Sequence, residues 1–359
     1  MSFDPESIRT AVLPHFPVAT SSALAPLGNG LINETFALTD PERGTFVLQR
    51  VNPLFSPAIH RNIQAVTTAL LRAGLPTQAL VATNDGQLCL QLANPLGGGA
   101  PAVWRLMTFV AGHSFEVVSG PRQARAAGAL IARFHAALDG LAHTFLGLRG
   151  GVHDTPKHLA TLRRALAAHP EHRLHAAVAP LGAGILAAAD ALPALPALTP
   201  RICHGDLKFN NVLFAGEALP DGESALCLID LDTVGPLSLA YELGDAWRSW
   251  CNRGGENVPV AELDLEIFLA SLDGYRGALG RALADDEREA LLLGPEWISL
   301  ELAARFAADA LTESYFGWDR ERFSGRGEHN LVRARGQLSL HRAFAATRAT
   351  RARAFVNDG

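Results

Sequence analysis

The sequence predicts an α+β chain of two lobes, in which a five-stranded antiparallel amino-terminal lobe precedes a mainly helical carboxy-terminal lobe. Short apolar runs bounded by Gly, Pro and Asn fill the chain up to about residue 110, as is typical of strands. From Pro121 onward the sequence is rich in alanine, and its apolar residues follow helical spacing. The length of 359 residues also exceeds that of a typical single domain. We therefore expect lobes at residues 1–110 and 111–359.

The amino-terminal part carries start and turn signals for each expected element. Asp4 followed by Pro5 is typical of a helix start, and this helix is expected to reach about Leu13. Glycines and an asparagine near residue 29 predict the turn of a hairpin. The expected strands lie in the hairpin at residues 24–38 and at residues 45–51, 88–92 and 102–109, and a helix covers residues 57–73.

The carboxy-terminal part is predicted to be helical on both sides of one polar stretch. Pro196 and Pro200 end the helical pattern before that stretch, because proline removes a backbone donor. His135 lies within the first helical pattern, where we expect a core histidine rather than a catalytic one. The expected helices start at Pro121, cover residues 156–169 and 171–192, and resume from about Leu239 to the end of the chain.

The polar stretch, residues 201–214, carries the main functional signal. His204, Gly205 and Asp206 are followed after four residues by Asn211, which is the H-x-D-x-x-x-x-N order of a protein-kinase catalytic loop. Asp230 then ends the apolar run 225–229, where a second metal-binding carboxylate is expected. A surface turn that contains the same residue types is the structural alternative.

Phosphoryl transfer explains why these residue types are useful together. The protein must orient the attacking hydroxyl, accept its proton and neutralise phosphate charge. Asp206 is our candidate for the proton acceptor, and Lys208 can place its ammonium group on the transferring phosphate. Asn211 and Asp230 offer the hard oxygen ligands that Mg²⁺ prefers.

These motifs resemble the aminoglycoside phosphotransferase and choline-kinase-like superfamily, and residues 208–214 with 228–233 are most similar to its N-acetylhexosamine 1-kinase branch. The resemblance implies a protein-kinase-like two-lobed fold, with ATP and Mg²⁺ as cofactors. It also implies phosphorylation of a sugar, at the anomeric hydroxyl of an N-acetylhexosamine. Aminoglycoside, choline or homoserine phosphotransferases are the alternatives. Further similar segments are residues 46–52, 104–109, 241–248 and 329–335.

The resemblance assigns a nucleotide-binding role to the turn of the hairpin and to the end of the last strand. Gly28, Asn29 and Gly30 correspond to the loop that covers the phosphates, and a simple hairpin turn is the alternative. Residues 106–111 correspond to the hinge that offers backbone groups to adenine, with an edge strand leaving the sheet as the alternative. Met107 and Phe109 are the hinge residues that we expect to contact the nucleotide.

The third strand departs from the kinase pattern. Gln49 stands where kinases carry a phosphate-binding lysine, and Arg50 points to the opposite face. The helix at residues 57–73 has no acidic residue to pair with such a lysine. We expect Gln49 to contact phosphate as a neutral donor, while Lys208 supplies more of the charge.

Four residues are expected on the acceptor side, each with a structural alternative. His153 and Asp154 resemble a His-Asp segment near the substrate of sugar kinases, but Asp154 ahead of Pro156 also fits a helix N-cap. Asp245 either binds substrate or supports the catalytic loop. Arg305 matches a substrate-side arginine of the resembling branch, with a surface salt bridge as the alternative.

Composition narrows the partners and the location. The net charge of −5 gives no reason to expect a nucleic acid or an anionic membrane as partner. The four cysteines show no C-x-x-C pair, so neither a disulfide framework nor a zinc signature is indicated. No signal peptide or membrane span is visible. We expect a cytoplasmic monomer or homodimer that acts on a small molecule.

Two other classes of protein remain open. A nucleotide-binding module without catalysis is favoured by the missing lysine and disfavoured by Asp206, Asn211 and Asp230. A metal-dependent hydrolase requires transition-metal ligands that converge on one point. Its candidate ligands are His204, Asp206, Asp230 and Asp232.

Overall fold

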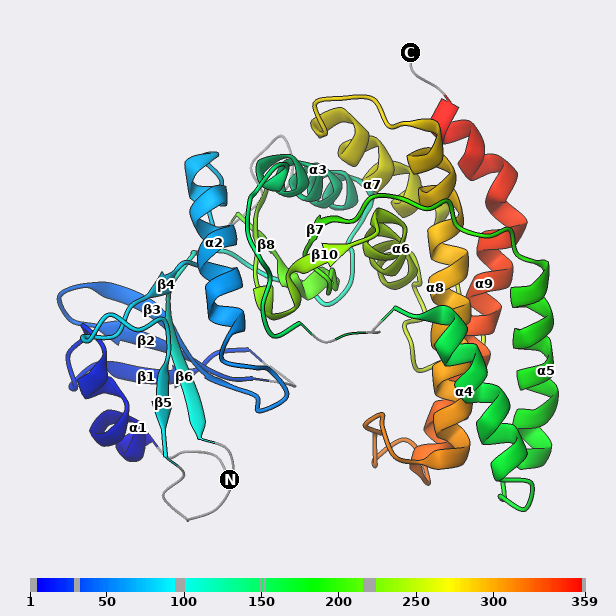
Figure 1. The fold of residues 1–359 in the computed structure, drawn as a ribbon, viewed down its shortest axis with the longest axis horizontal. Helices are drawn as coiled ribbons and strands as arrows, with labels where there is room; N and C mark the ends of the chain where they lie inside the picture. Colours follow the sequence, from blue (N-terminus) through cyan, green and yellow to red (C-terminus); the bar gives the residue numbers. More distant parts are fainter. Residues whose placement is uncertain are drawn as a thin grey trace.

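The computed structural model describes residues 5–28, 33–93, 101–148, 150, 153–215 and 224–356. Within these residues the chain forms a sheet lobe followed by a helical lobe, so the predicted α+β architecture is confirmed. Figure 1 shows the strands β1 to β6 together on one side and the helices α4, α5, α8 and α9 on the far side. Short strands lie between these two groups, where the polar stretch is located.

The sheet of the first lobe is antiparallel and runs in the order β1-β2-β3-β6-β4, with β5 also paired to β6. The expected hairpin is present, and Gly28 at its turn has φ +71°, while Asn29 and Gly30 lie outside the described residues. The two-residue strand β4 was not predicted, because two residues cannot show an alternating pattern. The strands are β1 (Ala23–Pro26), β2 (Glu34–Asp40), β3 (Gly44–Val51), β4 (Leu80–Val81), β5 (Leu90–Leu92) and β6 (Ala102–Thr108).

The two faces of this sheet meet different neighbours. On one face, Leu48, Trp104 and Leu106 pack in a buried cluster with α1 (Pro5–Ala11) and the turn η1 (Leu13–His15). Side chains alternate along a strand, so the residues between them belong to the opposite face. That face packs against α2 (Ile59–Arg72) and continues into the core of the helical lobe. Gln49, Arg105 and Met107 therefore lie on the side of the sheet that faces the second lobe.

The helical lobe has helices where the sequence predicted them, but non-helical segments at residues 251–264, 279–284 and 313–325 interrupt the helical pattern expected after Leu239. The largest shift is at α5, which begins at His175 instead of residue 171. None of the described helices combines the length and the apolar character that crossing a membrane requires. The helices are α3 (Pro121–Leu138), α4 (Thr155–Ala168), α5 (His175–Ala191), α6 (Leu239–Trp250), α7 (Leu265–Ala278), α8 (Asp285–Thr312) and α9 (Arg326–Val356).

Two short antiparallel strand pairs, which the sequence did not predict, hold the polar stretch. One pair joins β7 (Arg201–Cys203) to β10 (Gly235–Leu237), and the other joins β8 (Val212–Phe214) to β9 (Ala225–Leu228). The short turn η2 (Phe209–Asn211) follows the loop that contains Asp206. The short turn η3 (Leu231–Thr233) follows Asp230. Asp206 and Asp230 thus lie on loops whose ends are fixed by hydrogen-bonded strands.

Helices α3 and α7 approach each other closely because glycines face the contact. A Cβ atom on Gly128 would lie 2.0 Å from the carbonyl oxygen of Ser271, and one on Gly274 would lie 2.0 Å from that of Arg125. Real Cβ atoms do not come so close to backbone oxygens. The absence of side chains at these two positions therefore sets the distance between α3 and α7.

We predict that Gly274→Ala lowers the free energy of unfolding by about 1–3 kcal/mol, because the added methyl group overpacks the contact between α3 and α7. Gly277→Ala on the same helix is the matched control, since nothing lies within 4 Å of its added Cβ. That control should raise stability by about 0.5–1 kcal/mol through helix propensity. Urea denaturation of the three proteins measures both effects, and equal midpoints for the two variants would contradict the close contact.

Candidate active site

The loop after β7 is held in one conformation by its own backbone contacts. His204 is buried, its Nε2 lies 2.8 Å from the carbonyl oxygen of Ile229, and its Nδ1 lies 3.3 Å from the backbone N–H of Asp206. Both ring nitrogens are therefore occupied by backbone groups. Gly205 has φ +82°, and a Cβ there would lie 2.7 Å from the carbonyl oxygen of Thr233. Only glycine fits this position without strain.

A buried carboxylate on α6 holds the same loop from behind. Glu242 Oε1 accepts the N–H of His204 at 2.8 Å, and its Oε2 accepts the N–H of Gly205 at 2.9 Å. Burial acts to raise the pKa of Glu242, but the neighbouring His135 and these hydrogen bonds lower it on balance. Glu242 is therefore an ionised carboxylate with two backbone donors.

His135, Cys203 and Glu242 also form a buried group of potential metal ligands, whose ligand atoms lie within 4.8 Å of one another. Two observations give the group a structural role. The carboxylate of Glu242 already accepts two backbone N–H groups, and His135 Nδ1 lies 3.0 Å from the hydroxyl of Tyr275. Burial raises the pKa of Cys203 well above its ordinary value, so the thiol stays protonated.

Asp206 and Lys208 lie at the open side of the loop. Lys208 Nζ is 3.1 Å from Asp206 Oδ2, and the two side chains are 53% and 21% exposed, respectively. Burial acts to lower the pKa of Lys208, but the carboxylate of Asp206 and the charges of Asp245 and Asp230 raise it on balance. A permanent positive charge thus stands beside an accessible carboxylate.

Asp230 combines an unusual backbone with an unpartnered oxygen. Its φ of 62° is in the left-handed region, which non-glycine residues rarely adopt. Its Oδ1 is buried and has no hydrogen-bond partner among the described residues. Burial, and then the charge of Asp232, raise the pKa of Asp230 to about 6. A buried carboxylate oxygen without a donor is the kind of atom that a cation satisfies.

Asn211 is fixed next to the same loop. Its amide nitrogen donates to the carbonyl oxygen of Asp206 at 2.9 Å, and its backbone carbonyl accepts the N–H of Ile229 at 2.9 Å. The amide oxygen is consequently the side-chain atom that can serve as a metal ligand. The oxygens of Asn211 and Asp230 together fit the preference of Mg²⁺ for hard ligands.

A buried network that the sequence did not predict connects the turn after Asp230 to the sheet of the first lobe. Arg105 forms an ion pair with Asp232, and their side chains are 1% and 2% exposed. Arg105 Nε also donates to Gln49 Oε1 at 2.8 Å, and Asn33 Nδ2 donates to Asp232 Oδ2 at 2.8 Å. Gln49, expected to contact phosphate, thus lies beside the buried cation. The register of β3 and β6 places Gln49 opposite Arg105, so knowing this register would have revealed the contact between the two side chains.

Met107 and Phe109 differ in their surroundings. Met107 is buried on β6, whereas Phe109 follows the end of that strand and is 39% exposed. A small cavity of about 10 Å³, room for roughly one water molecule, adjoins Arg105, Met107 and Asp230. Of the two expected hinge residues, Met107 therefore lines the cavity beside Asp230, and Phe109 does not.

The residues expected on the acceptor side come from two helices, α6 and α8, and from the loop before α4. His153 lies 3.2 Å from the buried Glu301 and stacks on Tyr241 with ring centroids 5.4 Å apart. Burial acts to lower the pKa of His153, but the hydrogen bond to Glu301 and the charge of Asp245 raise it on balance. Asp154 caps α4 by accepting the N–H of Lys157 at 3.1 Å.

Asp245 and Arg305 each have a charged neighbour that the sequence did not assign. Asp245 lies 2.8 Å from Arg248, and burial acts to raise its pKa, but Arg248 and His153 lower it on balance. Arg305 lies 3.9 Å from Glu301 and places its guanidinium 5.4 Å from the ring centroid of Phe316. The acceptor side thus contains fixed charges of both signs.

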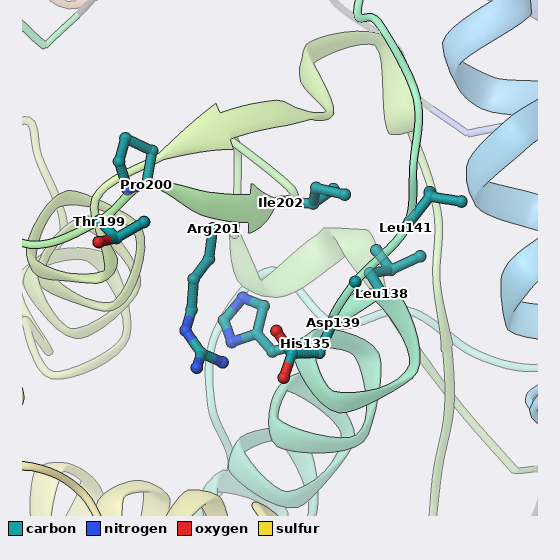
Figure 2. Close-up of a pocket in the computed structure, with 9 residues that line it drawn as sticks. His135, Leu138, Asp139, Leu141, Thr199, Pro200, Arg201 and Ile202 are labelled. Atoms are coloured by element: carbon teal, nitrogen blue, oxygen red, sulfur yellow. The ribbon is translucent and has the colours of Figure 1, made fainter.

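A larger cavity lies elsewhere. It has a volume of about 290 Å³ and lies between the end of α3 and the start of β7. Figure 2 shows His135, Asp139 and Arg201 among its lining side chains. None of the residues that line it belongs to the segment 206–211 or to the turn at Asp230. The small interlobe cavity, rather than the larger one, adjoins the candidate metal ligand Asp230.

Comparison with known proteins identifies the family and the fold of the chain. The pattern of the phosphotransferase enzyme family matches residues 23–292, which is more than half of the chain. The chain therefore belongs to the phosphotransferase enzyme family.

Solved structures share the whole two-lobed, protein-kinase-like fold at low sequence identity. An aminoglycoside phosphotransferase from Alicyclobacillus acidocaldarius is 16% identical, with a TM-score of 0.63 over 98% of this chain and 97% of that one. A microcompartment-associated aminopropanol kinase is 17% identical, with a TM-score of 0.62 over 96% and 98% of the two chains. An amicoumacin kinase in complex with AMP-PNP, Ca²⁺ and Ami is 14% identical, with a TM-score of 0.62 over 94% of this chain and 93% of that one.

We predict that Glu242→Gln lowers the free energy of unfolding at pH 7 by about 1–3 kcal/mol, because an amide turns a donor toward one of the two backbone N–H groups. The lowered pKa of Glu242 means that its ionised form contributes fully above its ordinary value of 4.5. The difference from the wild type should therefore shrink as the pH falls below that value. Urea denaturation at several pH values tests this, with the exposed Glu289→Gln on α8 as control; matching curves for the two variants would contradict it.

Proposed function

We propose that the protein is an ATP- and Mg²⁺-dependent kinase that phosphorylates a hydroxyl group of a small molecule. The observation that carries the proposal is the pair of carboxylates on two neighbouring loops. Asp206 is accessible beside Lys208, and Asp230 keeps a buried oxygen without a partner. One carboxylate is thus available to substrate, and the other is available to a cation.

Each residue then has one task. Asp206 accepts the proton of the acceptor hydroxyl, and Lys208 offers positive charge where the phosphate is transferred. Asn211 and Asp230 hold Mg²⁺, which neutralises phosphate charge when it is bound. Glu242 keeps the loop in place through the N–H groups of His204 and Gly205.

The nucleotide is expected between a sheet lobe of residues 1–110 and a helical lobe of residues 111–359. Gly28 at the hairpin turn, and Met107 and Phe109 at the end of β6, are the described residues assigned to it. The amicoumacin kinase of the same fold was solved with AMP-PNP and Ca²⁺, which supports a nucleotide and a divalent cation for this chain as well.

The acceptor is proposed to be a neutral sugar, with phosphorylation of the anomeric hydroxyl of an N-acetylhexosamine. Hydroxyl and acetamido groups can use both donors and acceptors, and the site offers both in His153, Asp245 and Arg305. The acidic side chains Asp245 and Glu301 already have Arg248 and Arg305 as neighbours, so they offer less unbalanced negative charge to a polycationic aminoglycoside.

The other candidates have weaker support. Recognition of choline requires aromatic faces that are open to a quaternary ammonium group. The rings of Tyr315 and Phe316 already lie 5.9 and 5.4 Å from the guanidinium of Arg305. A metal-dependent hydrolase would need His204 as a ligand, but both of its ring nitrogens contact backbone groups. A nucleotide-binding module without catalysis leaves the accessible Asp206 unexplained.

We predict that Asp206→Asn lowers turnover by about 10²–10⁴-fold, because the amide cannot accept the proton of the hydroxyl. Nucleotide affinity should stay close to that of the wild type, since Asp206 is not among the proposed metal ligands. Steady-state kinetics and calorimetric nucleotide binding measure the two effects. Asp190→Asn, an exposed position on α5, is the control and should leave turnover unchanged. Normal turnover in Asp206→Asn would remove the assigned proton acceptor.

We also predict that N-acetylglucosamine or N-acetylgalactosamine accepts phosphate from ATP faster than kanamycin, choline or homoserine. The physical reason is the balance of fixed charges around His153, Asp245 and Arg305, which suits a neutral polar ligand. ADP release is measured in parallel with all five acceptors at equal concentration. A clear preference for kanamycin or choline would reject the sugar while leaving the kinase proposal intact.

A further inference from the structure

The sheet lobe contains no lysine, so a permanent buried positive charge in it must come from an arginine. The sequence contains two lysines, Lys157 and Lys208, and both follow residue 150. The strand β3 carries Gln49 at the position expected for the phosphate-binding cation. Among the described residues before residue 110, Arg105 is the one arginine that is buried, at 1% exposure.

Arg105 lies on the same sheet face as Gln49, one strand further along. The register of β3 and β6 places the two residues directly opposite each other, and Arg105 Nε donates to Gln49 Oε1 at 2.8 Å. Directly opposite residues in an antiparallel pair have their Cβ atoms close together. The buried cation therefore lies on β6 instead of β3, directly beside the position where the kinase pattern has its lysine.

The partner of Arg105 lies in the other lobe, next to a proposed metal ligand. Asp232 pairs with Arg105 through Oδ1 and accepts the amide N–H of Asn33 through Oδ2 at 2.8 Å. Asn33 Oδ1 in turn accepts the backbone N–H of Asn52 at 2.9 Å. Two groups of the sheet lobe therefore hold Asp232, and Asp232 follows Asp230 by two residues. Holding one end of this short turn restricts where the free oxygen of Asp230 can lie.

The segment that forms helix α2 contains no acidic residue. The helix instead places the neutral side chain of His60 near Arg105 and Asp232. His60 is buried at 1% exposure, and burial followed by the charge of Arg105 lowers its pKa to about 4. The imidazole is therefore uncharged at neutral pH, and Asp232 is the acidic residue that forms an ion pair with Arg105. A buried ion pair is weak evidence for stability as such, because desolvation offsets its attraction. A positioning role explains its presence between the lobes.

We propose that Arg105 is the positioning residue of the nucleotide and metal site, which through Asp232 holds the Asp230 turn against the sheet lobe. From β6 it performs the task expected of a lysine on β3 together with an acidic residue on the following helix. The role of Arg105 rests on the proposed function, since it acts on the Mg²⁺ ligand Asp230. It predicts that removing Arg105 weakens Mg²⁺-dependent nucleotide binding rather than acceptor binding.

The test measures AMP-PNP binding by calorimetry at a series of Mg²⁺ concentrations. Steady-state kinetics are measured in parallel. Arg105→Gln removes the cation. The swap combines Arg105→Gln with Gln49→Arg, and it returns the cation at the directly opposite position on β3. Arg351→Gln is the matched control, because Arg351 is also fully buried and paired, with Glu296 at 2.6 Å, between α8 and α9.

The expected result separates positioning from stability. Arg105→Gln should raise the Mg²⁺ concentration for half-maximal AMP-PNP binding by about 10–100-fold, as is typical when a group that orients a metal ligand is lost. Turnover should fall while the KM of the acceptor is unchanged, and the swap should restore most of the Mg²⁺ affinity. Arg351→Gln should melt at a lower temperature but keep the wild-type Mg²⁺ requirement.

Other outcomes overturn the assignment. A folded Arg105→Gln protein with the wild-type Mg²⁺ requirement shows that Arg105 does not position the metal site. If Arg105→Gln does not fold, the double-variant swap provides the test. A folded swap protein with a raised Mg²⁺ requirement rejects the proposal. A folded swap protein with the wild-type Mg²⁺ requirement supports it. A wild-type protein that binds no AMP-PNP with Mg²⁺ rejects the proposed function itself, and the role of Arg105 with it.

Discussion

The candidate active site depends on one buried carboxylate. Glu242 accepts the backbone N–H groups of His204 and Gly205, and so it fixes the two residues that precede Asp206. A carboxylate accepts two such donors more strongly than a neutral group, because the hydrogen bonds are charge-assisted. Since Glu242 belongs to α6 and touches His135 of α3, the loop inherits its position from the packed helices of the second lobe.

The turn after β9 shows how environment separates two identical side chains. Asp232 has Arg105 and Asn33 as partners, and although burial opposes them, these partners lower its pKa. Asp230 is buried without a donor on Oδ1, and its pKa rises to about 6. Both oxygens of Asp232 thus have partners within the protein, while Asp230 Oδ1 has none among the described residues. The distinction between a structural and a functional carboxylate comes from the partners and not from the residue type.

The acceptor side is assembled from elements that are distant in the chain. Glu301 of α8 is fully buried and accepts from Thr155 at the start of α4 at 2.7 Å, next to His153. Asp245 of α6 adds a negative charge that acts on both His153 and Lys208. The proposed acceptor-side residues are therefore coupled electrostatically to Lys208, and their charges come from α6, α8 and the loop before α4 together.

The sequence by itself determined what acts over short distances along the chain. The spacing of Asp206 and Asn211 defines one loop, helical periodicity defines the second lobe, and alternating residues define the longer strands, because local propensity and burial pattern act over a few residues. Their roles in catalysis stay predictions. Only the tertiary structure decided which distant groups meet: Arg105 with Asp232, 127 residues apart, and Asn33 with Asp232, 199 residues apart. Such pairs leave no local pattern, since a charge buried in one lobe is balanced by whatever group the packing of the other lobe brings to it.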